Sequence, residues 1–144
     1  MKVLIINGPN LNMLGKRDEK HYGDKTLEAI NKMLLEKAKT LNLRLEFYQS
    51  NIEGELVTAI QNAKVDAIII NGGAYTHYSI AIRDALADKK ALKIEVHLSN
   101  ILAREEFRKT SVLSEVCTGI ISGFAEQSYV LALEYVKSAL IKGS

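Results

Sequence analysis

Five short apolar runs alternate with amphipathic segments along this chain, and this alternation constrains its fold more than any other feature. The runs are rich in Val, Ile and Leu and are mostly continuous, which is typical of strands that are covered on both faces. The segments between them repeat apolar residues at the spacing of one helix face. The strands are expected near residues 2–7, 43–49, 65–70, 92–97 and 116–122.

Four amphipathic stretches supply the helices that connect these strands. They cover approximately residues 27–41, 56–63, 78–85 and 129–140. Asp24 or Thr26 is the candidate N-cap of the first helix. Strands that alternate with helices imply right-handed crossovers and a parallel sheet. We therefore expect an α/β protein with a flavodoxin-like, doubly wound sheet of five parallel strands in the order 2-1-3-4-5.

Length and composition fit one globular domain that spans residues 1–144. With 47% hydrophobic residues, 25% charged residues and a net charge of +2, the chain carries no basic stripe that would indicate nucleic-acid binding. No apolar run approaches the ~20 residues that cross a bilayer, and no signal-peptide cleavage site is apparent. The only cysteine, Cys117, cannot form an internal disulfide. We therefore expect a cytoplasmic protein, with this thiol buried rather than nucleophilic.

Polar clusters follow four of the expected strands at the point where each strand ends. They occupy residues 7–10, 49–51, 71–73 with His77 beyond, and 97–100. The carboxyl ends of parallel strands meet at one edge of a sheet, where open α/β folds bind ligands. We therefore expect the clusters to gather into one active site.

Glu95 and His97 are two residues apart at the end of a strand, so their side chains project from the same face. A carboxylate beside an imidazole can fix its tautomer and favour its protonated form, which produces a general acid. A hydrogen-bonded structural histidine is the alternative. The position at the end of a buried strand favours the catalytic interpretation.

The exit of the third strand allows two interpretations. Gly72 and Gly73 permit a tight turn, and Thr76 is a candidate cap for the helix that follows. The start of that helix could attract a carboxylate or phosphate, but a plain strand–turn–helix junction explains the glycines equally well. His77 and Asp84 share one helix face but lie ~10 Å apart along the axis. They are not expected to touch one small substrate unless a neighbouring subunit supplies one of them.

The segment 102–110 is expected to form one or two helical turns. Arg104 and Arg108 would share a face of it, where Glu105 and Glu106 could pair with them. This pattern is typical of a solvated helix. Either arginine could instead bind an anionic or hydroxylated ligand, and the spacing does not decide between these possibilities.

The connection from Gly8 to Gly23 is long and charged, whereas compact α/β loops usually contain ~2–6 residues. Because it starts at the binding edge and carries Arg17 and Tyr22, we expect a lid over the site. A guanidinium beside a phenol lowers the tyrosine pKa, and a shift from ~10 to near neutrality needs ~4 kcal/mol. Tyr22 in a closed lid could therefore serve as a base, whereas on a solvated loop both residues would be ordinary surface.

Several motifs of other enzyme classes are missing from the sequence. It has no spacing typical of a zinc site, no nucleophile elbow, no P-loop and no GxGxxG motif. No lysine lies at the carboxyl end of an expected strand, which argues against a Schiff base. The remaining chemistry is acid–base catalysis with no metal and no cofactor.

Five motifs resemble those of the type II 3-dehydroquinate dehydratases, in the same order and at the same spacing. They are NGPNLNMLGKR at 7–17 with Tyr22-Gly23, QSNIEGE at 49–55, GAYTHYS at 73–79, EVHLSN at 95–100 and REEFR at 104–108. Two departures are visible. The family usually has Asn-Pro-Gly where this chain has Asn71-Gly72-Gly73, which is expected to loosen that turn slightly. Residues 123–129 replace a segment that is usually richer in glycine, which bears on the conformation of that loop rather than on catalysis.

The resemblance implies a lyase that dehydrates 3-dehydroquinate to 3-dehydroshikimate by anti elimination through an enolate. This is a step of the shikimate pathway of chorismate and aromatic amino acid biosynthesis. By this resemblance, Tyr22 removes the proton next to the ketone and Arg17 favours its ionised form. Asn10 helps to hold a water that stabilises the enolate. His97, oriented by Glu95, protonates the departing hydroxyl.

The resemblance also implies the substrate contacts and the assembly. The substrate-binding residues are Asn71, Leu98 and Ser99 at the carboxylate, His77 and Arg108 at ring hydroxyls, and Asp84 in a neighbour's site. Members of the family typically form dodecamers, as tetramers of trimers, so a homo-oligomer is implied. The alternatives are the same reaction in quinate breakdown, a flavodoxin-like module that binds a flavin or nucleotide, and an inactive scaffold of the same fold.

Overall fold

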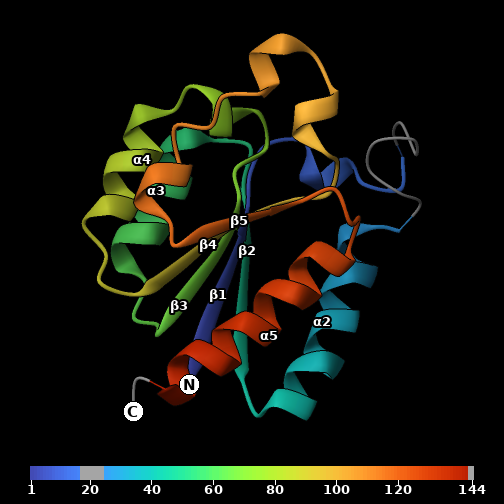
Figure 1. Ribbon diagram of the computed structural model, residues 1–144, viewed down its shortest axis with the longest axis vertical. Helices are drawn as coiled ribbons and strands as arrows, with labels where there is room; N and C mark the ends of the chain where they lie inside the picture. The colour runs from blue at the N-terminus through green and yellow to red at the C-terminus, as the bar shows by residue number, and fades with distance from the viewer. Residues whose placement is uncertain (17–24, 143–144) are drawn as a thin grey trace.

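A sheet of five parallel strands runs through the middle of the protein (Figure 1). The computed structural model describes residues 1–16 and 25–142. The strands are β1 (Lys2–Asn7), β2 (Arg44–Gln49), β3 (Ala67–Asn71), β4 (Leu92–His97) and β5 (Gly119–Ser122). They lie in the order β2-β1-β3-β4-β5, and all four neighbouring pairs are parallel. The predicted doubly wound, flavodoxin-like sheet is therefore confirmed.

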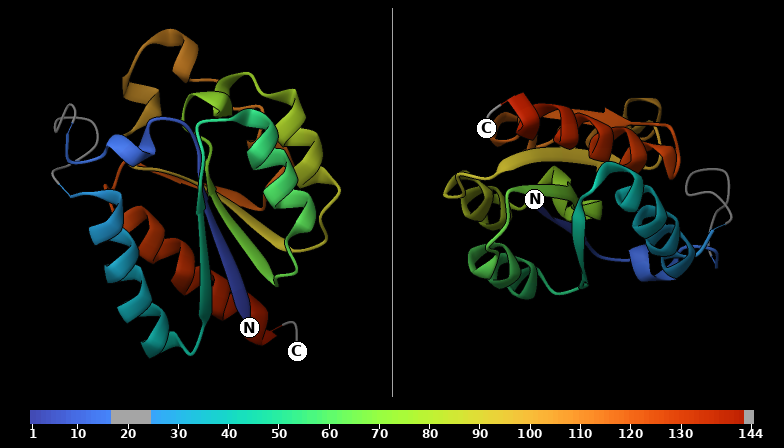
Figure 2. Two further views of the ribbon diagram at one scale, coloured as in Figure 1. Left: turned by 180° about the vertical axis from the view of Figure 1, so that it is seen from behind. Right: turned by 90° about the horizontal axis from the view of Figure 1, so that it is seen from below.

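Helices cover both faces of this sheet (Figures 1 and 2). In the described residues, α2 (Leu27–Leu41) and α5 (Gln127–Lys142) pack on one face, and α3 (Glu53–Asn62) and α4 (Ile80–Ala87) pack on the other. Thr26 caps α2, because its side chain accepts a hydrogen bond from the Ala29 backbone N–H at 3.1 Å. This confirms one of the two candidate caps.

The strand β1 shows how the sheet separates two hydrophobic clusters. Val3 and Ile5 pack toward α2 and α5, whereas Leu4 and Ile6 pack toward α3 and α4. All four side chains are buried, and each contributes about 1.5–3 kcal/mol relative to an exposed position. Burial on both faces explains why this strand is a continuous apolar run rather than an alternating one.

The short connections differ in part from the sequence predictions. The segment 102–110 contains helical turns, as expected, but they are two separate 3₁₀ turns, η3 (Ile101–Ala103) and η4 (Glu106–Arg108), rather than one helix, and η5 (Ser114–Val116) lies beyond them. The prediction that Thr76 caps the helix after β3 is wrong. A 3₁₀ helix, η2 (Gly73–His77), intervenes and buries Thr76, and the cap of α4 is Ser79, which accepts from the Ile82 N–H.

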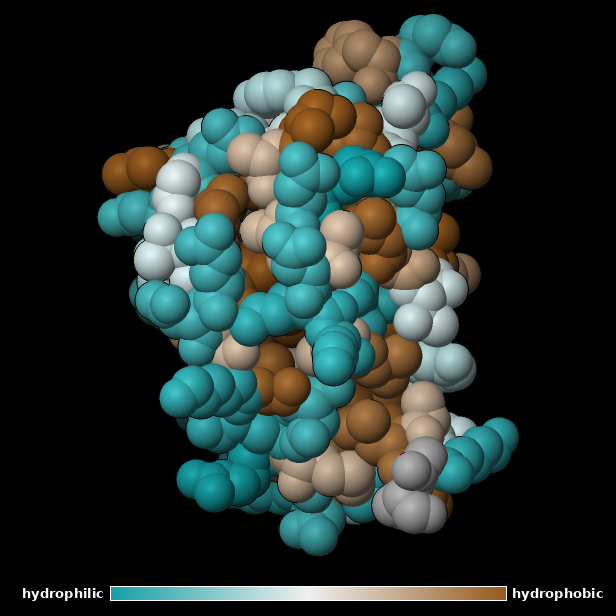
Figure 3. Space-filling model, turned by 90° about the vertical axis from the view of Figure 1, so that its left-hand side faces the viewer, coloured by the Kyte–Doolittle hydropathy of each residue, from teal (hydrophilic) through white to brown (hydrophobic). Residues whose placement is uncertain are grey.

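No helix in the described ranges has the length and apolarity that crossing a membrane requires. On the face seen from the side of α3 and α4, hydrophobic residues lie in groups among hydrophilic ones (Figure 3). Two large hydrophobic side chains at the start of α4, Tyr78 and Ile80, are exposed in the single chain.

The loop between β5 and α5 contains a strained residue, which allows a stability prediction. Ala125 has a φ of 50°, in the left-handed region, while its N–H donates to the Leu98 carbonyl at 3.0 Å. Glycine adopts this conformation without the steric cost that a Cβ imposes. We expect Ala125→Gly to raise the free energy of unfolding by about 1 kcal/mol, measured by urea denaturation.

The matched control is Ala29→Gly, at an exposed position inside α2. There glycine is expected to lower the free energy of unfolding by about 1 kcal/mol. Equal losses in both variants would contradict the assignment of strain to Ala125.

Candidate active site

A pocket lies at the carboxyl ends of β1, β3 and β4, next to the point where the strand order reverses between β1 and β3. Doubly wound sheets bind ligands at such a switch point. Its lining comes from residues at three strand ends: 9–11 beyond β1, part of the segment 71–77 at the end of β3, and part of the segment 97–101 at the end of β4. Arg104 and Arg108 complete it. Three of the four polar clusters in the sequence therefore meet in one place.

The fourth cluster, at the end of β2, supports the pocket from behind. The Asn51 side-chain oxygen accepts hydrogen bonds from the Asn10 backbone N–H at 3.0 Å and from the Gln49 amide at 3.2 Å. The Gln49 amide also donates to the Gly8 carbonyl at 3.1 Å. Asn10 has a φ of 70°, so these bonds help to hold an uncommon backbone conformation at the pocket wall.

The loops after β1 and β3 pack against each other backbone to backbone. A Cβ on Gly8 would lie 2.4 Å from the Gly72 carbonyl oxygen, and Gly73 has a φ of 58° with Pro9 against it. Glycine is therefore required at both positions. Gly72 itself has a φ of −73°, a value that proline also adopts, but a Cβ added here would lie 2.6 Å from the Thr76 hydroxyl oxygen, so the turn would have to shift to accept one.

A buried network ties the first turn of α5 to the ends of β1 and β3. The Tyr129 hydroxyl donates to the Asn7 side-chain oxygen and accepts from the Asn71 amide at 3.2 Å. The Asn71 side-chain oxygen accepts from the Gly73 N–H at 3.1 Å. Burial raises the pKa of Tyr129 far above its usual value, so its phenol stays neutral. The Asn71 amide is therefore fixed in orientation at the pocket.

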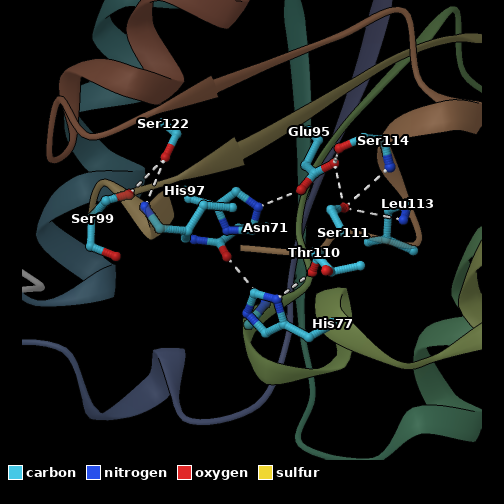
Figure 4. Close-up of polar contacts among 12 residues, drawn as sticks. Asn71, His77, Glu95, His97, Ser99, Thr110, Ser111, Leu113, Ser114 and Ser122 are labelled. Carbon is cyan, nitrogen blue, oxygen red and sulfur yellow. Dashed lines mark hydrogen bonds and ion pairs between the residues drawn. The ribbon is translucent and has the colours of Figure 1, made fainter. Parts of the chain in front are cut away.

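Glu95 and His97 form a buried pair at the end of β4 (Figure 4). The Glu95 carboxyl Oε2 lies 2.5 Å from the His97 Nε2. Its other oxygen, Oε1, accepts hydrogen bonds from the hydroxyls of Ser114 at 2.5 Å and Ser111 at 2.9 Å. His97 lines the pocket, and its Nδ1 has no hydrogen-bond partner among the described residues.

The electrostatics of this pair favour an ionised carboxylate. Burial acts to raise the pKa of Glu95, but the hydrogen bonds from His97, Ser114 and Ser111 outweigh it and hold this pKa below its usual value. An ionised Glu95 accepts the Nε2 proton of His97 and stabilises a positive imidazole. The geometry can therefore present a proton on Nδ1 to a ligand in the pocket.

His77 lines the pocket as a neutral ring. Its Nδ1 lies 2.8 Å from the Thr110 carbonyl, to which it must donate, so the neutral ring leaves Nε2 as an acceptor. Burial lowers the pKa of His77, and this effect outweighs the bond to Thr110, which acts to raise it. A neutral His77 can accept a hydrogen bond from a ligand hydroxyl.

Two arginines add positive charge to the pocket. The Arg104 side chain is only 10% exposed, and its guanidinium lies 3.4 Å from the Ser99 hydroxyl. Arg108 bonds Glu105 at 3.1 Å. The expectation that the two share a helix face is wrong, because Arg104 has an extended backbone between η3 and η4, yet both side chains reach the pocket. The two guanidiniums favour an anionic ligand.

Asp84 does not line the pocket, and two other predicted site residues lie outside the described part of the chain. Asp84 lies on α4 with its side chain 65% exposed and paired with Arg83 at 3.3 Å. Arg17 and Tyr22, and with them the proposed lid, lie outside the described residues. Cys117 is half-buried rather than fully buried, and burial raises the pKa of its thiol to about 12, so it remains a thiol at neutral pH. Within residues 1–16 and 25–142, no three His, Cys, Asp or Glu side chains are grouped to hold a metal ion.

Three polar residues of the site were not identified from the sequence. They are Ser111, Ser114 and Tyr129. Tyr129 carried a weak signal, because a buried Tyr hydroxyl usually finds a partner. The two serines gave no signal in the sequence, because their bonds to Glu95 depend on how an irregular segment packs against β4.

Comparison with known proteins gives one consistent result. The family model for class II dehydroquinases matches residues 1–137. A 3-dehydroquinate dehydratase of Thermotoga neapolitana is 51% identical over 144 residues, covering 100% of this chain and 99% of the relative. One of Caldicellulosiruptor bescii is 54% identical over 142 residues, covering 96% and 98%. The crystal structure of type II dehydroquinase from Butyrivibrio crossotus superimposes with a TM-score of 0.92 at 49% identity, covering 94% of this chain and 97% of that one.

Proposed function

Because this chain belongs to the class II dehydroquinase family, we propose that it is a lyase that dehydrates 3-dehydroquinate to 3-dehydroshikimate in the shikimate pathway. One observation in the site carries the chemistry. The Glu95 carboxyl binds the His97 imidazole at 2.5 Å, at the wall of a pocket rich in positive charge. A leaving hydroxyl needs a proton, and this pair is built to deliver one.

The acid half of the reaction falls to His97. Its Nδ1 gives a proton to the departing hydroxyl, which leaves as water, while Glu95 holds the opposite ring nitrogen. Elimination then completes the carbon–carbon double bond next to the ketone, and the enolate returns to a carbonyl. An acid of this kind typically contributes about 10²–10⁴-fold to the rate.

The base half falls to the segment that carries Arg17 and Tyr22. The Tyr22 phenolate removes the proton next to the ketone, and the Arg17 guanidinium favours the phenolate. Asn10 holds a water at the enolate oxygen. Support for its role comes from its position in the pocket lining and from the bond that its backbone makes to Asn51. Closure of the segment over the pocket would exclude water and strengthen these interactions.

Substrate binding uses the rest of the pocket wall. The substrate carboxylate is held by the Asn71 amide and by the backbone and hydroxyl of Leu98 and Ser99, near the charge of Arg104. His77 and Arg108 contact ring hydroxyls, for which the neutral Nε2 of His77 is a suitable acceptor. This arrangement suits a small anionic polyol.

The assembly follows from the same family. We propose a homo-oligomer, a dodecamer built as a tetramer of trimers, in the cytoplasm. Asp84 is exposed and does not line its own chain's pocket, which supports a role in a neighbour's site. Exposed Tyr78 and Ile80 at the start of α4 supply apolar surface for such a contact. Analytical ultracentrifugation distinguishes a dodecamer from a trimer or monomer.

Other functions are not favoured. A module that binds a flavin or nucleotide leaves the Glu95–His97 pair without a role, and the curated relatives described above are named as dehydratases. A role in quinate breakdown is likewise not favoured over the biosynthetic one.

A direct assay tests this function. The purified protein is mixed with 3-dehydroquinate, and the ultraviolet absorption of the conjugated product is followed. Substrate deuterated at one of the two hydrogens next to the ketone reports whether the elimination is anti. Sodium borohydride added with substrate is expected to leave activity intact, because no Schiff base forms. Absence of turnover would overturn the assignment.

A further inference from the structure

The loop Thr110–Ser114 contacts the His77 imidazole and the Glu95 carboxylate that holds His97, although it contributes no residue to the pocket lining. The Thr110 carbonyl accepts the bond from His77 at 2.8 Å. The hydroxyls of Ser111 and Ser114 both donate to the Glu95 oxygen that faces away from His97 (Figure 4). One irregular segment thus bonds His77 directly and bonds Glu95, the partner of His97.

The loop is itself well anchored, so its hydroxyls are held in fixed directions. The Ser111 hydroxyl accepts hydrogen bonds from the N–H groups of Leu113 at 3.1 Å and Ser114 at 3.2 Å. The Val112 N–H donates to the Thr76 carbonyl at 2.9 Å. Because Ser111 accepts two backbone bonds, its own proton is directed at Glu95. The two serines are therefore preorganised donors rather than mobile surface hydroxyls.

We propose that Ser111 and Ser114 are positioning residues for the catalytic acid: they hold Glu95 ionised and turned so that its other oxygen, Oε2, orients His97. This inference rests on the proposed dehydration. It goes beyond it by assigning to these hydroxyls the charge state of a carboxylate that is fully buried. Without the two donors, an isolated carboxylate in this environment takes up a proton more readily.

The other charged groups near Glu95 do not replace the serines. His97 and Lys93 share β4 with it, His77 faces it from η2, and Cys117 follows η5. Lys93 is occupied by the Lys89 carbonyl, and Cys117 stays a neutral thiol. On η5, Glu115 is paired with Arg83 at the surface. Only the serine hydroxyls and His97 donate hydrogen bonds to the carboxylate among the described residues.

The test is Ser114→Ala, which removes one donor and no other recorded side-chain bond among the described residues. In the substrate-free protein, ¹³C NMR of the Glu95 carboxyl follows its protonation, with the resonance assigned by Glu95→Gln. The protonation midpoint is expected to rise by about one to two pH units, the size expected for one lost hydrogen bond to a charged group. The acidic limb of the kcat profile should move upward by a similar amount, with KM nearly unchanged.

Two further variants separate positioning from folding. Ser114→Thr keeps the hydroxyl and is expected to restore both midpoints. Ser50→Ala removes a serine-to-carboxylate bond at 2.5 Å, to Glu55, and the bond that the same hydroxyl accepts from the Ile52 N–H at 2.9 Å, at the end of β2, which β1 and β3 separate from β4. It is expected to cost at least as much stability in thermal unfolding while leaving the Glu95 midpoint and the position of the acidic limb unchanged.

The outcomes distinguish this inference from the function on which it rests. If wild-type protein turns over 3-dehydroquinate but Ser114→Ala moves neither the NMR midpoint nor the acidic limb, the serines have no positioning role. A shift in the NMR midpoint without a shift in the kinetic limb would also overturn the inference. If wild-type protein shows no turnover, the proposed function fails and the catalytic part of the inference fails with it, whereas the NMR titration still decides whether the serines control Glu95.

Discussion

Replacing His97 with alanine is expected to lower kcat for 3-dehydroquinate by about 10²–10⁴-fold, because the variant lacks the group that we propose protonates the leaving hydroxyl. It also leaves Glu95 buried without its partner at 2.5 Å. Breaking a buried pair in this way costs about 3–5 kcal/mol of stability. The single-turnover rate must therefore be measured well below the unfolding temperature of the variant.

His97→Gln separates the chemical effect from the structural one. The glutamine amide can donate to Glu95, as Nε2 of His97 does, but it cannot transfer a proton. We expect its kcat to fall as far as that of the alanine variant, while its unfolding temperature stays closer to wild type. Single-turnover rates near the wild-type value in either variant would remove His97 from the acid role.

Replacing Tyr22 with phenylalanine is expected to lower kcat by about 10²–10⁴-fold while KM stays within a small factor. The change removes the single hydroxyl that we propose acts as the base, so the loss is expected in the transition state rather than in substrate binding. Steady-state kinetics across the pH range measure both constants. The wild-type pH–rate profile is expected to contain a limb that reports ionisation of the base. This limb is expected to be absent from the profile of the variant.

Tyr135→Phe is the matched control for this change. Tyr135 is partly exposed on α5 and is not among the pocket residues, so loss of its hydroxyl is expected to leave kcat unchanged. Substantial turnover by Tyr22→Phe would show that another group removes the proton. Equal losses in the two variants would point to a general effect on folding.

The sequence predicted the sheet because each strand is marked by its own composition. The run Val3–Ile6 is continuous and apolar because both faces are covered, and the structure buries all four of its side chains. The polar residues that follow each strand could be assigned to one edge because parallel strands share a direction. Glu95 and His97 could be paired because strand geometry alone puts residues two apart on the same side. These predictions depended on local geometry.

The contacts that were missed depend on irregular backbone. Arg104 was placed on a helix with Arg108, but it reaches the pocket from an extended residue between two 3₁₀ turns. Ser111 and Ser114 meet Glu95 across 16 and 19 residues of chain, through a segment with no repeating pattern. The prediction that Thr76 caps the helix after β3 is wrong because periodicity cannot reveal a 3₁₀ turn inserted before a helix. The roles of Arg17 and Tyr22 stay predictions.

Asn7, Asn71 and Tyr129, which join β1, β3 and α5, differ from the Glu95–His97 pair beside them because none of the three is ionised near neutral pH. Asn7 and Asn71 carry no ionisable proton, and burial keeps the Tyr129 phenol from losing its own. Their mutual bonds therefore survive unaltered in mild acid or mild alkali, whereas the Glu95 carboxylate on β4 can take up a proton. A change in pH that protonates Glu95 can therefore lower activity reversibly, while the bonds that hold the Asn71 amide at the pocket stay in place.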